Sequence, residues 1–193
     1  MRAALLLIDV QKIYTTAGSP LFVEGNDVAI ANMNRLIDHA ASRSDFIVYV
    51  KHVHKKDGSD AGRMFDFTGQ PGEISFVEGT ADVDLDPRLK LQKGALTITK
   101  GRYSAFVGTG LDETFKREKV NRIAVTGFMT NYCCETTARQ GHDLDYYVDF
   151  IMDATGCPDA SAEIRQPLIK SVTGAVLAGG FACVMSTGDY LAK

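Results

Sequence analysis

Three residues with reactive side chains are spread along the sequence, and each follows soon after a short apolar run. They are Asp9, Lys100 and Cys133, and the apolar runs before them span residues 3–8, 96–99 and 122–126. Apolar runs of this length are typical of strands buried on both faces of a parallel sheet. Ligands of such a sheet bind beyond the carboxyl ends of its strands, so we expect the three side chains to meet at one rim. Taken alone, each residue has a simpler interpretation, namely a charge leaving the core or a cysteine that packs as a small apolar residue.

Together the three side chains form a coherent set for acyl transfer. A cysteine attacks as a thiolate, and its free pKa of about 8.5 leaves little thiolate at neutral pH. The ammonium of Lys100 and the helix N-terminus expected beside Cys133 would both favour the thiolate. Asp9 could take the thiol proton and return it to a leaving amine, while backbone N–H groups at the helix start hold the oxyanion. Such a set suits hydrolysis of an amide or a related C–N bond.

The pattern of apolar residues predicts the scaffold that positions this site. The 193 residues suit one domain over residues 1–193. Strands are expected at 3–8, 46–50, 96–99, 122–126, 146–150 and 181–184, and helices at 26–40, 111–117, 135–141 and 158–177. We expect Asn26 to cap the first helix and Pro167 to weaken the last. Alternating strands and helices predict a single-domain, three-layer α/β/α sandwich around a mostly parallel, six-stranded, Rossmann-like sheet.

One segment, residues 54–86, does not follow this alternation. It contains five glycines and several aromatic residues, and its apolar residues show little periodicity. A loop of this length inside a compact domain is usually functional, so it could be a lid or a wall of the binding site. An irregular segment that covers a sheet edge is an equally good interpretation.

Composition and charge exclude several classes of protein. The net charge of -3 and the pI near 5.8 argue against a nucleic-acid-binding surface. Apolar runs fall well short of the roughly 20 residues of a membrane span, and Asp9 interrupts the best candidate for a signal peptide. Four cysteines, two of them adjacent, indicate free thiols and a cytoplasmic setting rather than a disulfide framework. A Gly-x-Gly-x-x-Gly motif does not follow the first apolar run, which argues against a dinucleotide cofactor.

With these residues and motifs, the chain resembles the isochorismatase-like cysteine hydrolases. That superfamily includes nicotinamidases, carbamoyl-amine and ureidoacrylate amidohydrolases, and isochorismatases. The resemblance spans nearly the whole chain and rests on residues 7–11 (LIDVQ), 78–80 with 85–87, 100–106 (KGRYSAF), 126–139 (TGFMTNYCCETTAR) and 153–154. The lysine and cysteine motifs, in the right order and spacing, are its most specific part.

The resemblance implies a role for each residue of the cluster. Cys133 would be the nucleophile, because it stands three positions after the motif residue Thr130, and Cys134 would serve packing. Asp9 would be the base and acid, and Lys100 the cation beside both. The site would need no cofactor and would act on a small molecule, and the protein would be a homo-oligomer, a dimer or a tetramer.

The resemblance also implies the surroundings of the nucleophile. A non-proline cis peptide bond is expected at Phe128–Met129, and it would turn the Met129 N–H toward the substrate. That N–H and the one of Cys133 would form the oxyanion hole. Substrate-binding positions of the family correspond to Tyr14, Tyr103, Phe106 and Phe128. A role in the hydrophobic core is the alternative for these aromatic residues.

A metal site is not expected, although nicotinamidases of the family carry one after the second strand. His52 and His54 alternate with Val53 and would share a face, so they could chelate an ion. Lys51, however, replaces the acidic ligand before the first histidine, and further lysines follow the second. We expect solvated histidines at the end of a strand.

The sequence therefore predicts a cofactor-independent cysteine hydrolase that cleaves the C–N bond of a small amide, carbamoyl or ureido compound through a thioester. One alternative is an isochorismatase-type hydrolase of a vinyl ether, in which Asp9 acts as the acid and Cys133 is not needed. Another is an inactive binding or scaffold protein that retains the hydrolase fold.

Overall fold

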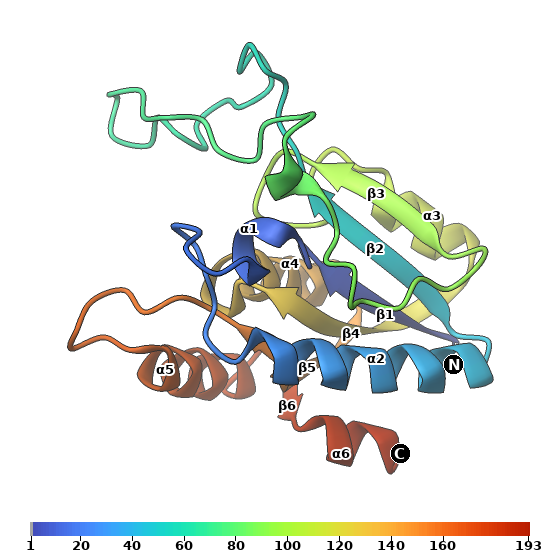
Figure 1. The fold of residues 1–193 in the computed structure, drawn as a ribbon. Coiled ribbons are helices and arrows are strands. Elements are labelled where there is room, and N and C mark those ends of the chain that lie inside the picture. Colours follow the sequence, from blue (N-terminus) through green and yellow to red (C-terminus); the bar gives the residue numbers. More distant parts are fainter. Residues whose placement is uncertain (1) are drawn as a thin grey trace.

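The fold is centred on a six-stranded sheet in a computed structural model that describes residues 2–193 (Figure 1). The strands are β1 (Arg2–Ile8), β2 (Phe46–His52), β3 (Leu96–Lys100), β4 (Val120–Phe128), β5 (Tyr147–Gly156) and β6 (Cys183–Met185). Their order in the sheet is β3-β2-β1-β4-β5-β6, and every neighbouring pair is parallel. The predicted α/β/α fold is confirmed, with a sheet that is parallel throughout.

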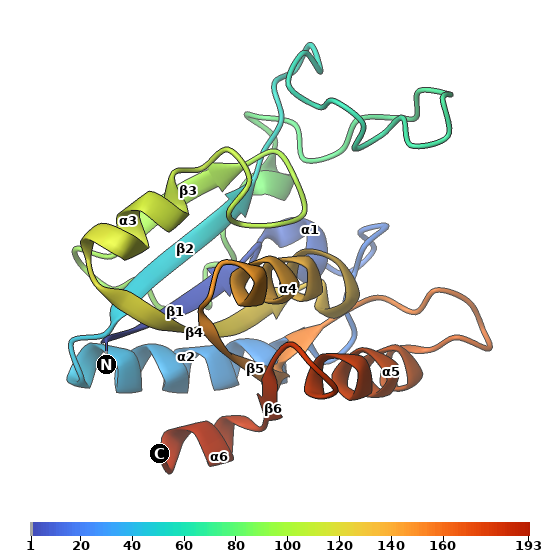
Figure 2. The ribbon, with the colours of Figure 1, turned by 180° about the vertical axis from the view of Figure 1, so that it is seen from behind.

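Helices cover both faces of the sheet (Figures 1 and 2). They are α1 (Lys12–Thr15), α2 (Asn26–Ser42), α3 (Leu111–Arg117), α4 (Glu135–Asp143), α5 (Gln166–Ala178) and α6 (Thr187–Leu191). Two further helical turns, the 3₁₀ turn η1 (Ala81–Val83) and the π-helical η2 (Thr130–Cys134), complete the helical elements of residues 2–193. α2 and α6 lie on one face, whereas α3, α4 and α5 lie on the other (Figure 2).

The central strand β1 shows why its sequence is apolar without interruption. Leu5 and Leu7 point into the core beneath α2, and Leu6 and Ile8 point into the core beneath α3 and α4. Side chains of a strand alternate between the two faces, so a strand covered on both faces must be apolar at every position.

The structure corrects two helix starts. α5 begins at Gln166, eight residues after Pro158, because Pro167 belongs in the first helical turn, where its missing N–H leaves no helix hydrogen bond unmade. Asp159 accepts a hydrogen bond from the backbone N–H of Gln166 instead of opening the helix. Asn26 is the first residue of α2 rather than its cap, which is Gly25, with φ 74°.

Residues 54–86 form an irregular segment that lies beyond the carboxyl ends of the strands, at the top of Figure 1. A parallel bridge between His54 and Val77 fixes its base beside β2. The short turn η1 follows before the chain returns along the protein to β3. This segment belongs to the connection from β2 to β3. The other consecutive strands are connected through regular helices. Within residues 2–193, every helix falls short of the length and apolar character needed to cross a bilayer.

Candidate active site

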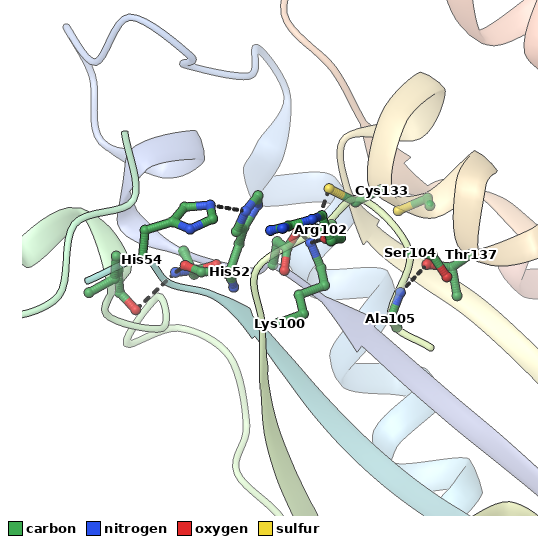
Figure 3. A network of polar contacts seen from close by, with 12 residues as sticks. His52, His54, Lys100, Arg102, Ser104, Ala105, Cys133 and Thr137 are labelled. Carbon is green, nitrogen blue, oxygen red and sulfur yellow. Dashed lines mark hydrogen bonds and ion pairs between the residues drawn. The ribbon is translucent and has the colours of Figure 1, made fainter. Parts of the chain in front are cut away.

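The three reactive side chains predicted from the sequence meet at the carboxyl rim of the sheet. Figure 3 shows two of them, Lys100 and Cys133, and the hydrogen bond between them. Lys100 ends β3, Asp9 follows β1, and Cys133 lies in η2, directly after β4. The Lys100 Nζ lies 2.8 Å from Asp9 Oδ2 and donates a hydrogen bond to Cys133 Sγ at 3.2 Å. All three residues are buried, with at most 2% of their surface exposed. Topology places them together because the strands that carry them end at the same edge.

Burial and the ion pair have opposite effects on the pKa values of this cluster. Burial raises the pKa of Asp9, and the neighbouring Lys100 ammonium offsets part of that rise. Burial alone would lower the pKa of Lys100, but the Asp9 carboxylate and Cys133 outweigh it and raise that pKa. Burial raises the pKa of Cys133 to about 12, against the attraction of Lys100. The raised pKa favours the protonated thiol, which agrees with the expectation that Asp9 must take its proton for attack.

A glycine beside the cluster permits the close approach of two strands. Gly127 has a φ of 110°, a conformation that L side chains rarely adopt, and a β-carbon there would overlap the backbone of Ile8. Asp9 itself has a φ of 51°, and its N–H donates to the carbonyl of Val50. The backbone thus turns sharply at the position where the carboxylate must leave β1.

The chain between β4 and Cys133 takes the predicted path. The peptide bond Phe128–Met129 is cis, and η2 follows it as a turn of π-helix that leads into α4. Thr130 donates a hydrogen bond to Thr155 of β5 at 2.9 Å, which fixes the start of the turn. Single π-helical turns in proteins are frequent at functional sites.

A cavity of about 150 Å³ opens beside Cys133. Its walls come from the segment after β1, from β2, from residues 54–86 and from the loops after β3 and β4: Tyr14, Leu21, His52, Met64, Phe65, Ser75, Phe76, Tyr103, Met129, Tyr132 and Cys133. Four of these residues belong to the irregular segment, which favours its interpretation as a wall of the site. A cavity this small suits a compact molecule, because pockets for drug-sized ligands run from about 300 Å³ upwards.

A second, outer cavity of about 430 Å³ adjoins the first. It shares Met64, Tyr103 and Tyr132 with the inner one, and adds Arg63, Phe67 and Arg102. The Arg102 guanidinium donates to the carbonyl of Asp60 at 2.9 Å, which ties the irregular segment to the loop after β3.

The four aromatic residues expected to bind substrate divide into two pairs. Tyr14 and Tyr103 line the inner cavity, and their role in substrate binding stays a prediction. Phe106 lies instead in the core, where it stacks on Tyr146. Phe128 is also a core residue, packed behind the ring of Tyr14 at 5.6 Å between centroids. The expected pocket positions of Phe106 and Phe128 are therefore corrected, because their rings point to the layers beneath the rim.

The prediction of solvated histidines after Lys51 is wrong, because both side chains are buried. His52 is 1% exposed and His54 is 0% exposed, because the irregular segment folds over both. Phe76 of that segment stacks on the His52 ring at 4.4 Å, and the two Nε2 atoms of the histidines lie 2.9 Å apart. Burial lowers the pKa of His52 to about 2, and the nearby Lys100 lowers it further, so its imidazole is neutral.

The same geometry bears on metal binding. Asp9, His52 and Cys133 bring three potential ligand atoms within 4.8 Å of one another. The Lys100 ammonium already contacts both the carboxylate and the sulfur of this set. A metal ion would meet that positive charge at the position where it needs anionic ligands, so the set suits a fixed ammonium and not a metal ion.

Gln11 lies beside the site and was assigned no role from the sequence. Its side-chain amide donates to the carbonyl of His52 at 3.0 Å and accepts from the N–H of His52 at 2.8 Å. It also donates to the carbonyl of Val83. Gln11 therefore holds the end of β2 in place, and its position in the motif LIDVQ, two residues after Asp9, is the only sequence signal for it.

Comparison with known proteins agrees with this geometry. The profile of the isochorismatase domain matches residues 3–187. The chain belongs to the isochorismatase family.

Individual relatives of this isochorismatase-family hydrolase cover most of its length. The chain is 32% identical over 154 residues to the "uncharacterized isochorismatase family protein YwoC" of Bacillus subtilis, covering 79% of this chain and 77% of the relative. It is 26% identical over 170 residues to the ureidoacrylate amidohydrolase RutB of Rhizobium rhizogenes, covering 79% and 69% of the two chains.

Solved structures show the same fold. The crystal structure of a cysteine hydrolase from Pseudomonas syringae superposes with a TM-score of 0.89, at 28% identity, over 99% of this chain and 91% of the other. An isochorismatase family protein from Desulfovibrio vulgaris superposes with a TM-score of 0.83, also at 28% identity, over 99% and 98% of the two chains.

Proposed function

We propose that this isochorismatase-family hydrolase uses Cys133 to cleave the C–N bond of a small amide, carbamoyl or ureido compound through a thioester. The observation that carries the proposal is the buried cluster of Asp9, Lys100 and Cys133 on the wall of a small cavity. The similarity to ureidoacrylate amidohydrolases and to a cysteine hydrolase supports it.

In the first half-reaction, Asp9 acts as general base. It takes the proton of the Cys133 thiol as the sulfur attacks the carbonyl carbon, and the C–S bond forms. The N–H groups of Met129 and Cys133 hold the oxyanion of the tetrahedral intermediate. Asp9 then gives its proton to the leaving nitrogen, the C–N bond breaks, and ammonia or an amine departs from the thioester.

The second half-reaction returns the enzyme to its starting state. A water molecule attacks the thioester carbonyl and gives a proton to Asp9. The C–S bond then breaks, Asp9 returns that proton to the sulfur, and the acid is released. Lys100 stabilises the carboxylate and the transient thiolate in turn, because its ammonium touches both groups.

The raised pKa values of Asp9 and Cys133 fit this scheme of proton transfer. A thiol with a pKa of about 12 needs a base at the moment of attack. A carboxyl whose pKa is raised by burial is a stronger base than an exposed one, and it remains a competent acid for the leaving group.

The test is a screen of small amides, N-carbamoyl compounds and ureides for release of ammonia or amine. The wild type should turn over at least one of them, and Cys133→Ala should not. The wild-type and Cys133→Ser enzymes should be quenched during turnover and compared by mass spectrometry. An acyl group should be found on residue 133 of the wild type. If Cys133→Ala retains most of the activity, the thioester route is wrong.

A further inference from the structure

We propose that His52 binds the substrate by accepting a hydrogen bond from an N–H on the side of the carbonyl that stays with Cys133, and that His54 and Asp60 fix the tautomer this requires. The inference rests on the proposed function and narrows its substrate class to carbamoyl and ureido compounds.

The position of His52 is the first observation. His52 lines the inner cavity, and one of its ring nitrogens lies within 4.8 Å of both an Asp9 carboxylate oxygen and Cys133 Sγ. Phe76 stacks on the ring, and the Gln11 side chain hydrogen-bonds to both the N–H and the carbonyl of His52. A buried side chain held this firmly at the reacting atoms is preorganised to bind a ligand.

The second observation is the chain of contacts behind it. His52 Nε2 lies 2.9 Å from His54 Nε2 (Figure 3). His54 Nδ1 lies 3.4 Å from Asp60 Oδ1. His54 Nδ1 makes no aligned hydrogen bond to this carboxylate, but the negative charge of Asp60 favours the proton of His54 on Nδ1, the nitrogen that faces it. The His54 Nε2 then carries the lone pair, and the His52 Nε2 must donate to it.

The protonation state of the other His52 ring nitrogen follows by elimination. With its proton on Nε2, His52 presents a lone pair at Nδ1, an atom that is buried and has no hydrogen-bond partner among residues 2–193. A buried acceptor of this kind costs about 1–3 kcal/mol when it stays unpaired, so a bound N–H is favoured there. Burial, with the charges of Lys100 and Arg102 nearby, keeps both imidazoles neutral by lowering the pKa of each histidine.

The geometry of the reaction assigns the N–H to one side of the substrate. The carbonyl oxygen must face the N–H groups of Met129 and Cys133, and the leaving nitrogen must face Asp9, which protonates it. The third substituent of the carbonyl carbon is left for the other walls of the cavity, which include His52, a buried side chain with one ring nitrogen within 4.8 Å of Cys133 Sγ. A carbamoyl or ureido group places a nitrogen there, and a simple carboxamide places a carbon.

The kinetic test uses two isosteric pairs. The substrates are the N-carbamoyl and N-acetyl derivatives of the same amine, starting with glycine, because a retained NH₂ and a retained CH₃ have similar size. The variants are His52→Leu and His52→Asn, which are close in size but differ in their ability to accept a hydrogen bond. The measurement is kcat/KM for each enzyme with each substrate, with the amine product detected.

The inference predicts how the preference changes. The ratio of kcat/KM for the carbamoyl over the acetyl substrate should fall about tenfold in His52→Leu, the size of one hydrogen bond. His52→Asn should recover part of that ratio. The difference in intrinsic reactivity of the two substrates cancels, since the same pair is compared in each enzyme. An unchanged ratio in His52→Leu overturns the role assigned to His52. If no acyl group is found on Cys133 in the wild type, the proposed function is overturned instead.

The tautomer is tested without turnover. The chain has four histidines, so long-range ¹H–¹⁵N spectra of histidine-labelled protein are simple to assign with single variants. His52 should show its proton on Nε2 and His54 on Nδ1. Asp60→Asn should preserve this pattern, because an amide oxygen also accepts, and Asp60→Ala should mix the tautomers. In Cys133→Ala, N-carbamoylglycine should shift the Nδ1 resonance of His52. A proton found on Nδ1 of His52, or one bound zinc ion per chain held between the two histidines, overturns the inference.

Discussion

Replacing Lys100 by methionine should destabilise the protein in a manner that depends on pH. Methionine keeps the length and apolar stem of lysine but removes the ammonium that lies 2.8 Å from Asp9. Both side chains of this ion pair are 0% exposed, so the Asp9 carboxylate would be left in the core without a counter-charge. Breaking a buried ion pair in this way costs about 3–5 kcal/mol. For a chain of this size the melting temperature should fall by about 6–20 °C.

The sign of the pH dependence follows from the pKa of Asp9. Burial already raises that pKa, and Lys100 is the main group that opposes the rise. Without Lys100, the folded variant retains a proton that the unfolded chain releases above about pH 4. The free energy of unfolding should therefore be best preserved below that pH, and fall by about 1.4 kcal/mol per pH unit up to the folded pKa of Asp9.

The assay is urea unfolding of wild type and Lys100→Met at about pH 5 and about pH 8, where the loss should be larger at the higher pH. Lys12→Met is the matched control, since Lys12 lies 3.0 Å from Asp84 at the surface and its loss should cost less than about 1 kcal/mol. The double variant Asp9→Asn/Lys100→Met should recover much of the stability and lose the pH slope. A loss in Lys100→Met that is no larger than that of the control, or that is the same at both pH values, refutes the electrostatic reasoning.

Three further outcomes follow from the geometry. In the free enzyme, iodoacetamide should alkylate the exposed Cys183 before Cys133, which is buried and has a pKa raised by burial to about 12; peptide mapping of a time course checks the order. Gly127→Ala should cost several kcal/mol in urea unfolding, because its β-carbon would overlap a β1 carbonyl and its φ is 110°. Gln11→Leu should leave two backbone groups of His52 without buried partners, at about 1–3 kcal/mol each, which unfolding and the ¹⁵N spectrum of His52 both report.

The parts of the fold that follow a local rule could be predicted from the sequence. Residues 3–8 of β1 are all apolar because this part of the strand is covered on both faces, and α3 spans Leu111–Arg117 as expected. The predicted start of α5 was wrong, because Pro167 does not interrupt the helix but lies in its first turn, where proline is favoured. α6 was not predicted, yet Ser186 and Asp189 form a capping box there, a signal that three-residue spacing could have revealed.

The predictable and unpredictable residues of the site differ in what positions them. Asp9, Lys100 and Cys133 are carried by the ends of strands, so the topology of a parallel sheet is enough to bring them together. His52 and His54 acquire their environment from residues 54–86, whose path depends on long-range contacts such as the stacking of Phe76 and not on any local period. The same division separates the chemistry from the choice of substrate. The proposed nucleophile and proton carrier belong to the strand ends at the rim, whereas much of the cavity wall belongs to the irregular segment. Changes within residues 54–86 should therefore alter which compound is cleaved, through KM and the substrate ratio, while acylation of Cys133 continues.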